Sequence, residues 1–280
     1  MSGAVVDAHV HVMPDRVRRE AARVAMADPW FAVCHAGDAR LADEADLLGH
    51  LDREGIDRAV VFTWPFRDPR LCAEANDFVA ELQRRHPDRV VGCGIVQPAD
   101  PGAGDELRRI AGLGLRGVGE LNSDAQGFEL DGDPVARLAA LSVELDLPWT
   151  LHCSEPVGHA YAGKGTATPE RWLRLAGRAA GLRLVAAHLG GGLPFYAHMP
   201  EVRELCATLW FDTAALPHLY RPSALTEVVS LIGAERILLG TDFPLLGLSR
   251  YRRALAAATM TDAERQLILG GSAAEVWRWP

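Results

Sequence analysis

The sequence is almost without lysine. Lys164 is the single lysine among 29 basic residues, so the others are arginines. Any site that needs a lysine must therefore use Lys164. Acidic residues outnumber basic ones by 37 to 29, which gives a formal net charge of −8. This balance argues against a nucleic-acid partner, because a nucleic-acid surface requires a basic stripe.

Long apolar runs are also missing. The sequence has no window of ~18 uncharged apolar residues, so we expect no transmembrane helix and no membrane partner. The first residues lack a basic segment and include Asp7, so we expect no secretory signal. The five cysteines are scattered and form no Cys-x-x-Cys pair. Free thiols in a reducing compartment are the simplest interpretation, which predicts a cytoplasmic protein.

The sequence does contain a repeated alternation of short apolar runs and amphipathic segments. The eight runs are Ala4–Val10, Arg58–Thr63, Val90–Val96, Leu115–Leu121, Pro148–Cys153, Arg183–His188, Leu209–Thr213 and Arg236–Thr241. They show little polar alternation, which is typical of parallel strands covered on both faces. The expected helices are Asp43–Glu54, Leu71–Arg85, Pro134–Leu145, Pro169–Ala180, Ser223–Ile232, Arg250–Ala258 and Asp262–Leu269.

This strand–helix alternation predicts right-handed units and a parallel sheet. Eight strands in 280 residues favour one α/β domain over residues 1–280, a (β/α)8 TIM barrel. A doubly wound open sheet is the alternative. Its dinucleotide-binding form is disfavoured because no Gly-x-Gly-x-x-Gly follows the first run.

Polar residues lie at the ends of five of the eight runs. They are His9, His11, Glu120, His152, His188 and Asp242. His9 and His11 are two residues apart on a strand, so both point to one face, about 6.5–7 Å apart. Two imidazoles at this spacing can bind one ion, and the active sites of barrels lie where the strands end. A single His-x-His is more often a core pair; the combination of six residues predicts a metal site.

Five motifs occur in an order that resembles the amidohydrolase superfamily: DAHVH, VGEL, LHCSE, AAHLGGG and LLGTDFP. The resemblance is to its branch of TIM-barrel metal-dependent hydrolases and decarboxylases. It implies that His9, His11 and Asp242 bind a divalent metal, expected to be Zn²⁺, and that Asp242 is a general base. His152 would complete this site and His188 would contact the metal-bound water or the substrate. In the binuclear form, His152 and His188 would instead hold a second ion.

The acidic residue on the fourth strand decides between these two forms. Some members bridge two metals with a carboxylated lysine there, but Lys164 follows the fifth run, so this bridge is not expected. Glu120 is either a metal ligand or a close neighbour of the metal. The alternative role for Glu120 is structural, as a buried carboxylate paired with an arginine such as Arg116. We expect one ion rather than two.

The loop after the fifth run is polar, rich in glycine and long. Long ordered loops in barrels are usually functional. Glu155, His159, Tyr161 and Lys164 are therefore candidate substrate-binding residues, with Lys164 as a cation for a carboxylate or phosphate. Trp64, after the second run, is a candidate aromatic wall. An ordinary solvated loop and, for Trp64, packing in the core are the alternatives.

Three functions are compatible with this sequence. The leading hypothesis is a metal-dependent hydrolase, in which metal-activated water attacks an amide, lactone or ester carbonyl of a small, anionic substrate. The alternative is a metal-dependent non-oxidative decarboxylase of a small unsaturated or aromatic carboxylic acid. A barrel that has lost catalysis is disfavoured, because all six polar strand ends are present. The expected partner is a small-molecule substrate, and a homodimer is the default assembly.

Overall fold

The computed structural model describes residues 3–35 and 40–278. In this part of the chain eight strands form one sheet in the order β1 to β8, and each strand pairs in parallel with the next. The strands are β1 (Val6–His11), β2 (Arg58–Phe62), β3 (Val90–Gly94), β4 (Gly117–Leu121), β5 (Trp149–Leu151), β6 (Leu184–Ala186), β7 (Leu209–Asp212) and β8 (Ile237–Leu238). Each of the eight predicted runs therefore overlaps a strand.

The segment that follows β8 joins the sheet to β1. Val10 forms a parallel bridge with Phe243, and the Ala8 amide donates a hydrogen bond to the Leu239 carbonyl at 2.7 Å. These contacts nearly close the sheet into a barrel. The predicted single-domain TIM barrel is confirmed, and the open sheet is excluded.

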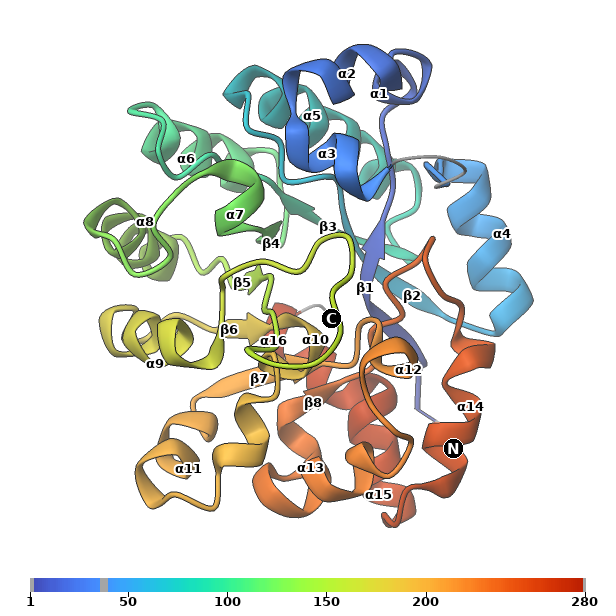
Figure 1. Ribbon diagram of the computed structural model, residues 1–280. Helices are drawn as coiled ribbons and strands as arrows, with labels where there is room; N and C mark the ends of the chain where they lie inside the picture. The colour runs from blue at the N-terminus through green and yellow to red at the C-terminus, as the bar shows by residue number, and fades with distance from the viewer. Residues whose placement is uncertain (1–2, 36–39, 279–280) are drawn as a thin grey trace.

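Helices surround the strands in a ring (Figure 1). They are α1 (Asp15–Arg19), α2 (Ala21–Ala27), α3 (Pro29–Cys34), α4 (Glu44–Glu54), α5 (Pro69–Arg85), α6 (Ala103–Gly112), α7 (Ser123–Gln126), α8 (Asp133–Glu144), α9 (Pro169–Arg178), α10 (Ala187–Gly190), α11 (Pro200–Cys206), α12 (Leu216–Leu219), α13 (Ala224–Ile232), α14 (Arg252–Ala257), α15 (Asp262–Gln266) and α16 (Ser272–Trp277). The seven predicted helices correspond to α4, α5, α8, α9, α13, α14 and α15.

Local sequence signals explain where several of these helices begin. Asp43 and Asp46 form a reciprocal capping box at α4, which satisfies amide groups that the first turn leaves free. Helices α8 and α9 each carry proline in the first turn, where the missing N–H costs nothing. Helix α4 ends at Gly55, whose φ of +69° suits a residue without a side chain.

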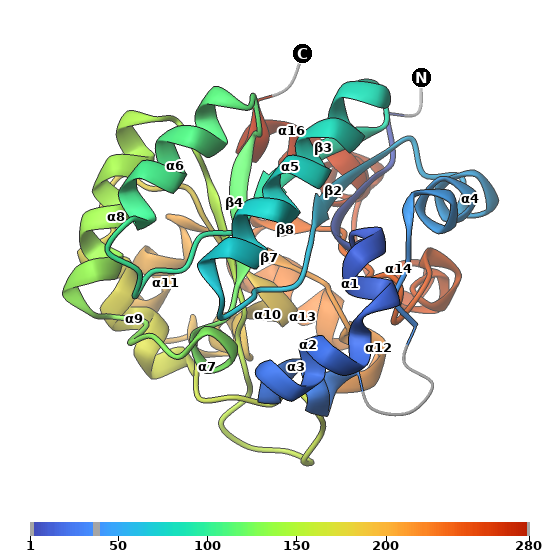
Figure 2. The same cartoon turned by 90° about the horizontal axis from the view of Figure 1, so that it is seen from above.

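The two ends of the barrel differ. At one end α16 packs its Trp277 and Val276 against strand residues such as Val60 and Val91 in a buried apolar cluster. At the other end lie α3, α7, α12 and the loop between β5 and α9 (Figure 2). This second end, where the strands finish, is the mouth of the barrel.

A bulge in β1 controls which side chains reach the mouth. The register of β1 against β2 shifts between Asp7 and Val10. Ala8 belongs to the cluster under α16, whereas Val10 belongs to the larger cluster that the helices share. The shift thus changes which residues face inward, and His9 and His11 lie together at the mouth.

No helix in residues 3–35 and 40–278 combines the length and the apolar character needed to cross a bilayer. All five cysteines are free thiols.

Candidate metal and substrate site

The two histidines of β1 are oriented by hydrogen bonds at their outer nitrogens. His9 Nδ1 lies 2.8 Å from Asp212 Oδ2, and His11 Nδ1 lies 3.2 Å from the Thr63 carbonyl oxygen. Because these oxygens accept, each Nδ1 carries the proton. The two Nε2 atoms are 3.0 Å apart, so the second nitrogen of each ring faces the same point.

His152 and His188 repeat this arrangement. His188 Nδ1 lies 3.1 Å from the Ala214 carbonyl oxygen, and His152 Nε2 lies 3.2 Å from the Gly163 carbonyl oxygen. Their inner nitrogens, His188 Nε2 and His152 Nδ1, are 3.1 Å apart. His188 follows β6 in the turn labelled α10, with φ of +57°. Such a conformation is costly for a non-glycine residue and is found most often at functional sites.

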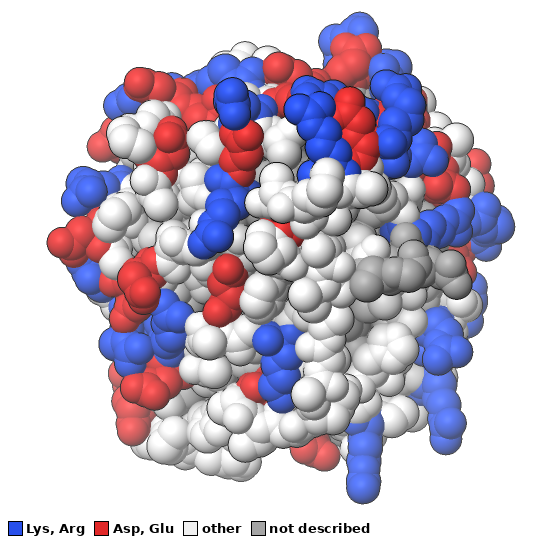
Figure 3. Space-filling model, turned by 45° about the horizontal axis from the view of Figure 1, so that its top comes forward, with Lys and Arg blue, Asp and Glu red and all other residues white. Residues whose placement is uncertain are grey.

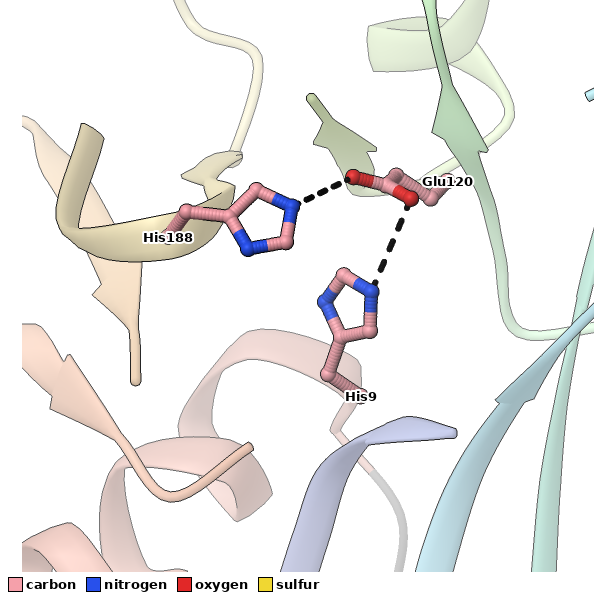
Figure 4. Close-up of side chains that lie close together, drawn as sticks. All are labelled: His9, Glu120 and His188. Carbon is pink, nitrogen blue, oxygen red and sulfur yellow. Dashed lines mark ion pairs between the residues drawn. The ribbon is translucent and has the colours of Figure 1, made fainter. Parts of the chain in front are cut away.

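Glu120 at the end of β4 lies between the two histidine pairs. Its Oε2 is 3.6 Å from His9 Nε2 and 3.5 Å from His11 Nε2. Its Oε1 is 3.0 Å from His152 Nδ1 and 3.3 Å from His188 Nε2. Figure 4 shows the carboxylate reaching both His9 and His188. Each oxygen therefore serves one pair of imidazoles.

The backbone beside Glu120 requires glycine. A Cβ at Gly119 would lie 2.3 Å from the Thr150 carbonyl oxygen, and the residue has φ of +132°. The strand can approach β5 this closely only without a side chain. The ion pairs of Glu120 are to histidines, so the alternative of a structural pair with Arg116 is not what the structure shows.

Asp242 completes the group from the segment after β8. Its Oδ1 lies 3.7 Å from His9 Nε2 and 3.6 Å from His11 Nε2. Its backbone has φ of +64°. The side chain is 17% exposed, so this carboxylate is open to the mouth, whereas Glu120 is buried.

The electrostatics of this group favour positive charge. Burial lowers the pKa of His9, but the carboxylates of Asp212 and Glu120 outweigh burial, and the pKa is raised well above its usual value. Burial also opposes the shift at His188, but Glu120 raises its pKa to about 9. Burial disfavours ionised Glu120, yet the neighbouring histidines hold its pKa well below the usual range. A field that attracts protons to these rings also attracts a metal cation, whose binding displaces the protons.

The donor atoms fit a divalent metal. Two groups of three have their ligand atoms within 4.8 Å of one another. One group is His9, His11 and Asp242, and the other is His9, Glu120 and His188. Imidazole nitrogen and carboxylate oxygen suit borderline and hard divalent ions. All six strand-end residues of the sequence prediction thus lie in one cluster.

Asp212, at the end of β7, was missed by the sequence analysis. One oxygen accepts from His9 Nδ1, and the other accepts from the backbone amides of His188 at 2.9 Å and Ala214 at 3.0 Å. It therefore fixes two of the histidines at once. An aspartate inside the apolar run Leu209–Thr213 was the available signal, because a fully buried charge needs partners.

Replacing Asp212 by asparagine is expected to weaken metal binding by about 10–100-fold, the usual cost of losing a partner that orients a ligand. Competition with a chromophoric chelator measures this affinity. The exposed Asp262, at the start of α15, gives the matched control Asp262→Asn. Equal affinities for the two variants and the unmodified protein would contradict the role given to Asp212.

The cluster lies at the base of a pocket of about 760 Å³ in the mouth of the barrel. Of the predicted substrate-binding residues, Trp64, His159 and Tyr161 line this pocket. The His159 and Tyr161 rings lie 5.5 Å apart, centre to centre. The volume suits a small organic molecule.

The other two predicted substrate-binding residues lie outside the lining. Glu155 accepts a hydrogen bond from the Tyr161 hydroxyl at 2.8 Å, so it orients a residue of the wall. Lys164 Nζ donates to the carbonyl oxygens of Val157 and His159, at 2.7 and 3.0 Å. The single lysine thus holds the β5–α9 loop in shape, and its contact with substrate stays a prediction.

Several pocket residues had no role in the sequence analysis. They are Trp30, Cys34, His35, Arg40 and His218. Four of them come from the stretch after β1, whose helices α2 and α3 fold against the mouth (Figures 1 and 2). His218 lies on the short helix α12 at the pocket. Sequence periodicity gives no signal for such placements, because they depend on how a loop folds back.

Comparison with known proteins identifies the family. The family model described as amidohydrolase matches residues 6–279. The chain is 26% identical over 256 residues to gamma-resorcylate decarboxylase of Rhodococcus jostii, covering 74% of this chain and 76% of the relative. It is 25% identical over 278 residues to 2-amino-3-carboxymuconate-6-semialdehyde decarboxylase of Dictyostelium discoideum, covering 81% of this chain and 74% of the relative.

Solved structures show the same fold. The 5-carboxyvanillate decarboxylase of Sphingomonas paucimobilis matches with a TM-score of 0.82 and 20% identity, covering 100% of both chains. A second match is a dihydroxybenzoic acid decarboxylase of Polaromonas sp. JS666, solved with manganese and the inhibitor 2-nitroresorcinol. It has a TM-score of 0.76 and 20% identity, and the match covers 99% of this chain and 97% of that chain.

These relatives correct one expectation and confirm another. The predicted hydrolase activity is wrong, because the similar proteins are named decarboxylases. The resemblance drawn from the five motifs is confirmed, since the family model spans nearly the whole chain. The chain belongs to the amidohydrolase family.

Proposed function

We propose that the protein is a metal-dependent, non-oxidative decarboxylase of a small aromatic or unsaturated carboxylic acid. The observation that carries this proposal is the decarboxylase activity named for its relatives, together with a cluster of histidine and carboxylate side chains that could hold a metal at an aromatic-walled pocket. The pocket supplies a place for the organic part of the acid, and the cluster supplies a place for its carboxylate.

We propose His9, His11 and Asp242 as ligands of one divalent ion, with Glu120, His152 and His188 beside it. Both candidate ligand groups contain His9, which supports one ion that would have His9 among its ligands. Zinc is the ion expected from the sequence, whereas a structural relative holds manganese, so the proposal is confined to a divalent metal. Such an ion, when bound, attracts the carboxylate of the acid and withdraws electrons from it.

The remaining chemistry needs a proton. Decarboxylation breaks the bond between the carboxylate carbon and the ring or alkene carbon, releases CO₂, and puts a proton on the carbon that is left. Asp242 is the carboxyl group at the base of the pocket that is open to the mouth. We assign it the transfer of this proton from its carboxylic acid form, after which it regains a proton from solvent.

The other residues hold the acid and the ligands in place. Trp64 and Tyr161 form part of the pocket wall, where they can stack on a flat substrate. Glu155 fixes the Tyr161 hydroxyl. The carbonyl oxygen of Gly163 accepts from His152 Nε2, so the β5–α9 loop also orients a residue that we place beside the metal.

A panel of aromatic and unsaturated carboxylic acids tests the proposal. Each acid is incubated with protein loaded with Mn²⁺ or Zn²⁺, and CO₂ and the decarboxylated product are quantified. Matched amides, esters and lactones are assayed for hydrolysis. We expect equal amounts of CO₂ and product from at least one acid. Hydrolysis of the amides, esters or lactones with no CO₂ from any acid would contradict the proposal.

Metal content gives a separate prediction. The purified protein is expected to carry about one divalent ion per chain and to lose activity when a chelator removes it, with recovery when the ion is returned. Elemental analysis and activity are measured on the same samples. A metal-free preparation with full activity would overturn the metal assignment.

A further inference from the structure

Trp64, in the pocket wall, is connected to α3 through one carboxylate. The carboxylate of Asp28 is buried and accepts two hydrogen bonds. Its Oδ1 accepts from the Phe31 backbone amide at 2.9 Å, and its Oδ2 accepts from the indole N–H of Trp64 at 3.3 Å. One carboxylate thus caps the start of α3 and ties it to the segment after β2. The indole donor of Trp64 is used in this contact, so Trp64 offers the pocket a ring face or edge.

His35, directly after α3, is oriented by the same unit. Its ring stacks on Phe31 with centres 4.2 Å apart and lies in a T-shaped arrangement with Trp64, with centres 4.6 Å apart. Its Nδ1 lies 3.2 Å from the Phe31 carbonyl oxygen, which only accepts, so the proton is on Nδ1. The half-buried ring lines the pocket. Nε2 is therefore left as a hydrogen-bond acceptor.

The neutral form of His35 is favoured by its surroundings. Burial lowers the pKa of His35 to about 4, with a smaller opposing effect from the hydrogen bond to Phe31. At neutral pH the ring is uncharged, so it accepts a hydrogen bond but does not pair with an anion.

Positive side chains are scarce in this pocket. Among the lining residues that the structure describes, Arg40 is the one arginine or lysine, and its guanidinium pairs with Asp46. Lys164 is held by carbonyl oxygens of its own loop. Charged side chains gather along the rim of the face shown in Figure 3, and its central area is largely uncharged. A second carboxylate on the substrate would find little to neutralise it.

From these contacts we infer that His35 Nε2 accepts a hydrogen bond from a ring hydroxyl of the aromatic acid, and that the pocket disfavours a second carboxylate on that acid. The inference rests on the proposed function, because the acid's own carboxylate is placed at the metal cluster. His35 is thus a specificity-determining residue, and it acts on a substituent that does not react.

Binding without turnover tests this inference. The Asp242→Asn protein, loaded with Mn²⁺, is titrated by calorimetry with benzoate, the three hydroxybenzoates, their methyl ethers and benzene-1,3-dicarboxylate. At least one hydroxybenzoate is expected to bind about tenfold more tightly than its methyl ether, the worth of one hydrogen bond. It is also expected to bind more tightly than the dicarboxylate.

Variants at position 35 locate the effect. Adding His35→Phe to the Asp242→Asn protein keeps a ring for stacking. This substitution is expected to reduce hydroxybenzoate affinity about tenfold and to change benzoate affinity less than twofold. His35→Gln retains an acceptor and is expected to recover part of the loss. His198→Phe, at an exposed histidine, is the matched control and should change neither affinity.

Three results would overturn the inference: an equal loss of hydroxybenzoate and benzoate affinity in His35→Phe, tighter binding of the dicarboxylate, or no binding of any hydroxybenzoate. Because binding is measured without turnover, these outcomes are separate from the proposed activity. Absence of CO₂ release by the unmodified protein would contradict decarboxylation while the binding comparison could still be read.

Discussion

Replacing Asp242 by asparagine is expected to lower kcat for CO₂ release by about 10²–10⁴-fold, the usual contribution of a positioned proton donor. Asparagine has nearly the same shape and keeps an oxygen for the metal, but it has no carboxylic acid proton to give. The side chain is at the base of the pocket, within 3.7 Å of the nitrogens of both β1 histidines. Steady-state kinetics on the best acid of the panel measure the loss.

The comparison needs proof that the metal is still bound. Elemental analysis of the same Asp242→Asn sample is expected to find metal, and calorimetry is expected to find substrate affinity within a few-fold of the unmodified protein. Asp262→Asn serves as the control for a surface aspartate. A metal-loaded Asp242→Asn protein with a normal kcat would remove Asp242 from the proton transfer.

Replacing His11 by alanine is expected to abolish both metal-dependent stabilisation and activity. A ligand that binds only the folded state stabilises it by about 2.7 kcal/mol at a concentration of 100 times Kd. For a chain of this size that corresponds to roughly 5 °C in Tm. His11 is more accessible than His9, with 13% of its side chain exposed, so its removal leaves a smaller buried defect.

Thermal unfolding with and without added Mn²⁺ or Zn²⁺ measures this effect. The unmodified protein is expected to gain several degrees, and His11→Ala is expected to gain less than one. His86→Ala provides a control outside the metal cluster, since His86 follows α5 and pairs with Glu44. Equal metal-induced shifts in His11→Ala and the unmodified protein would show that His11 is not a ligand.

The fold was predictable because its signals are local. Buried parallel strands leave apolar runs, and helix starts leave proline and capping residues, as at α4, α8 and α9. The short helices α1 to α3 were not predicted, because they are held by contacts far apart in sequence, such as the one between Asp28 and Trp64. Strand β8 is shorter than its apolar run, since the residues after Leu238 turn to carry Asp242 to the mouth.

The site was predictable to the extent that its residues mark strand ends. His9 and His11 come together as the spacing indicates, although a bulge sets the face they share. His188 lies beyond the end of β6, in a left-handed turn that no strand pattern predicts. Asp212 and His35 could not be assigned from sequence, because their roles come from the partners that the fold brings to them.

Whether the protein decarboxylates is tested most directly by the fate of the substrate carbon in heavy water. The metal-loaded protein is incubated in D₂O with the best acid of the panel, and the product is analysed by mass spectrometry and NMR. Decarboxylation predicts one deuterium on the carbon that carried the carboxylate, together with one CO₂ per product. A product that keeps its carboxylate and gains the elements of water would contradict decarboxylation and restore hydrolysis.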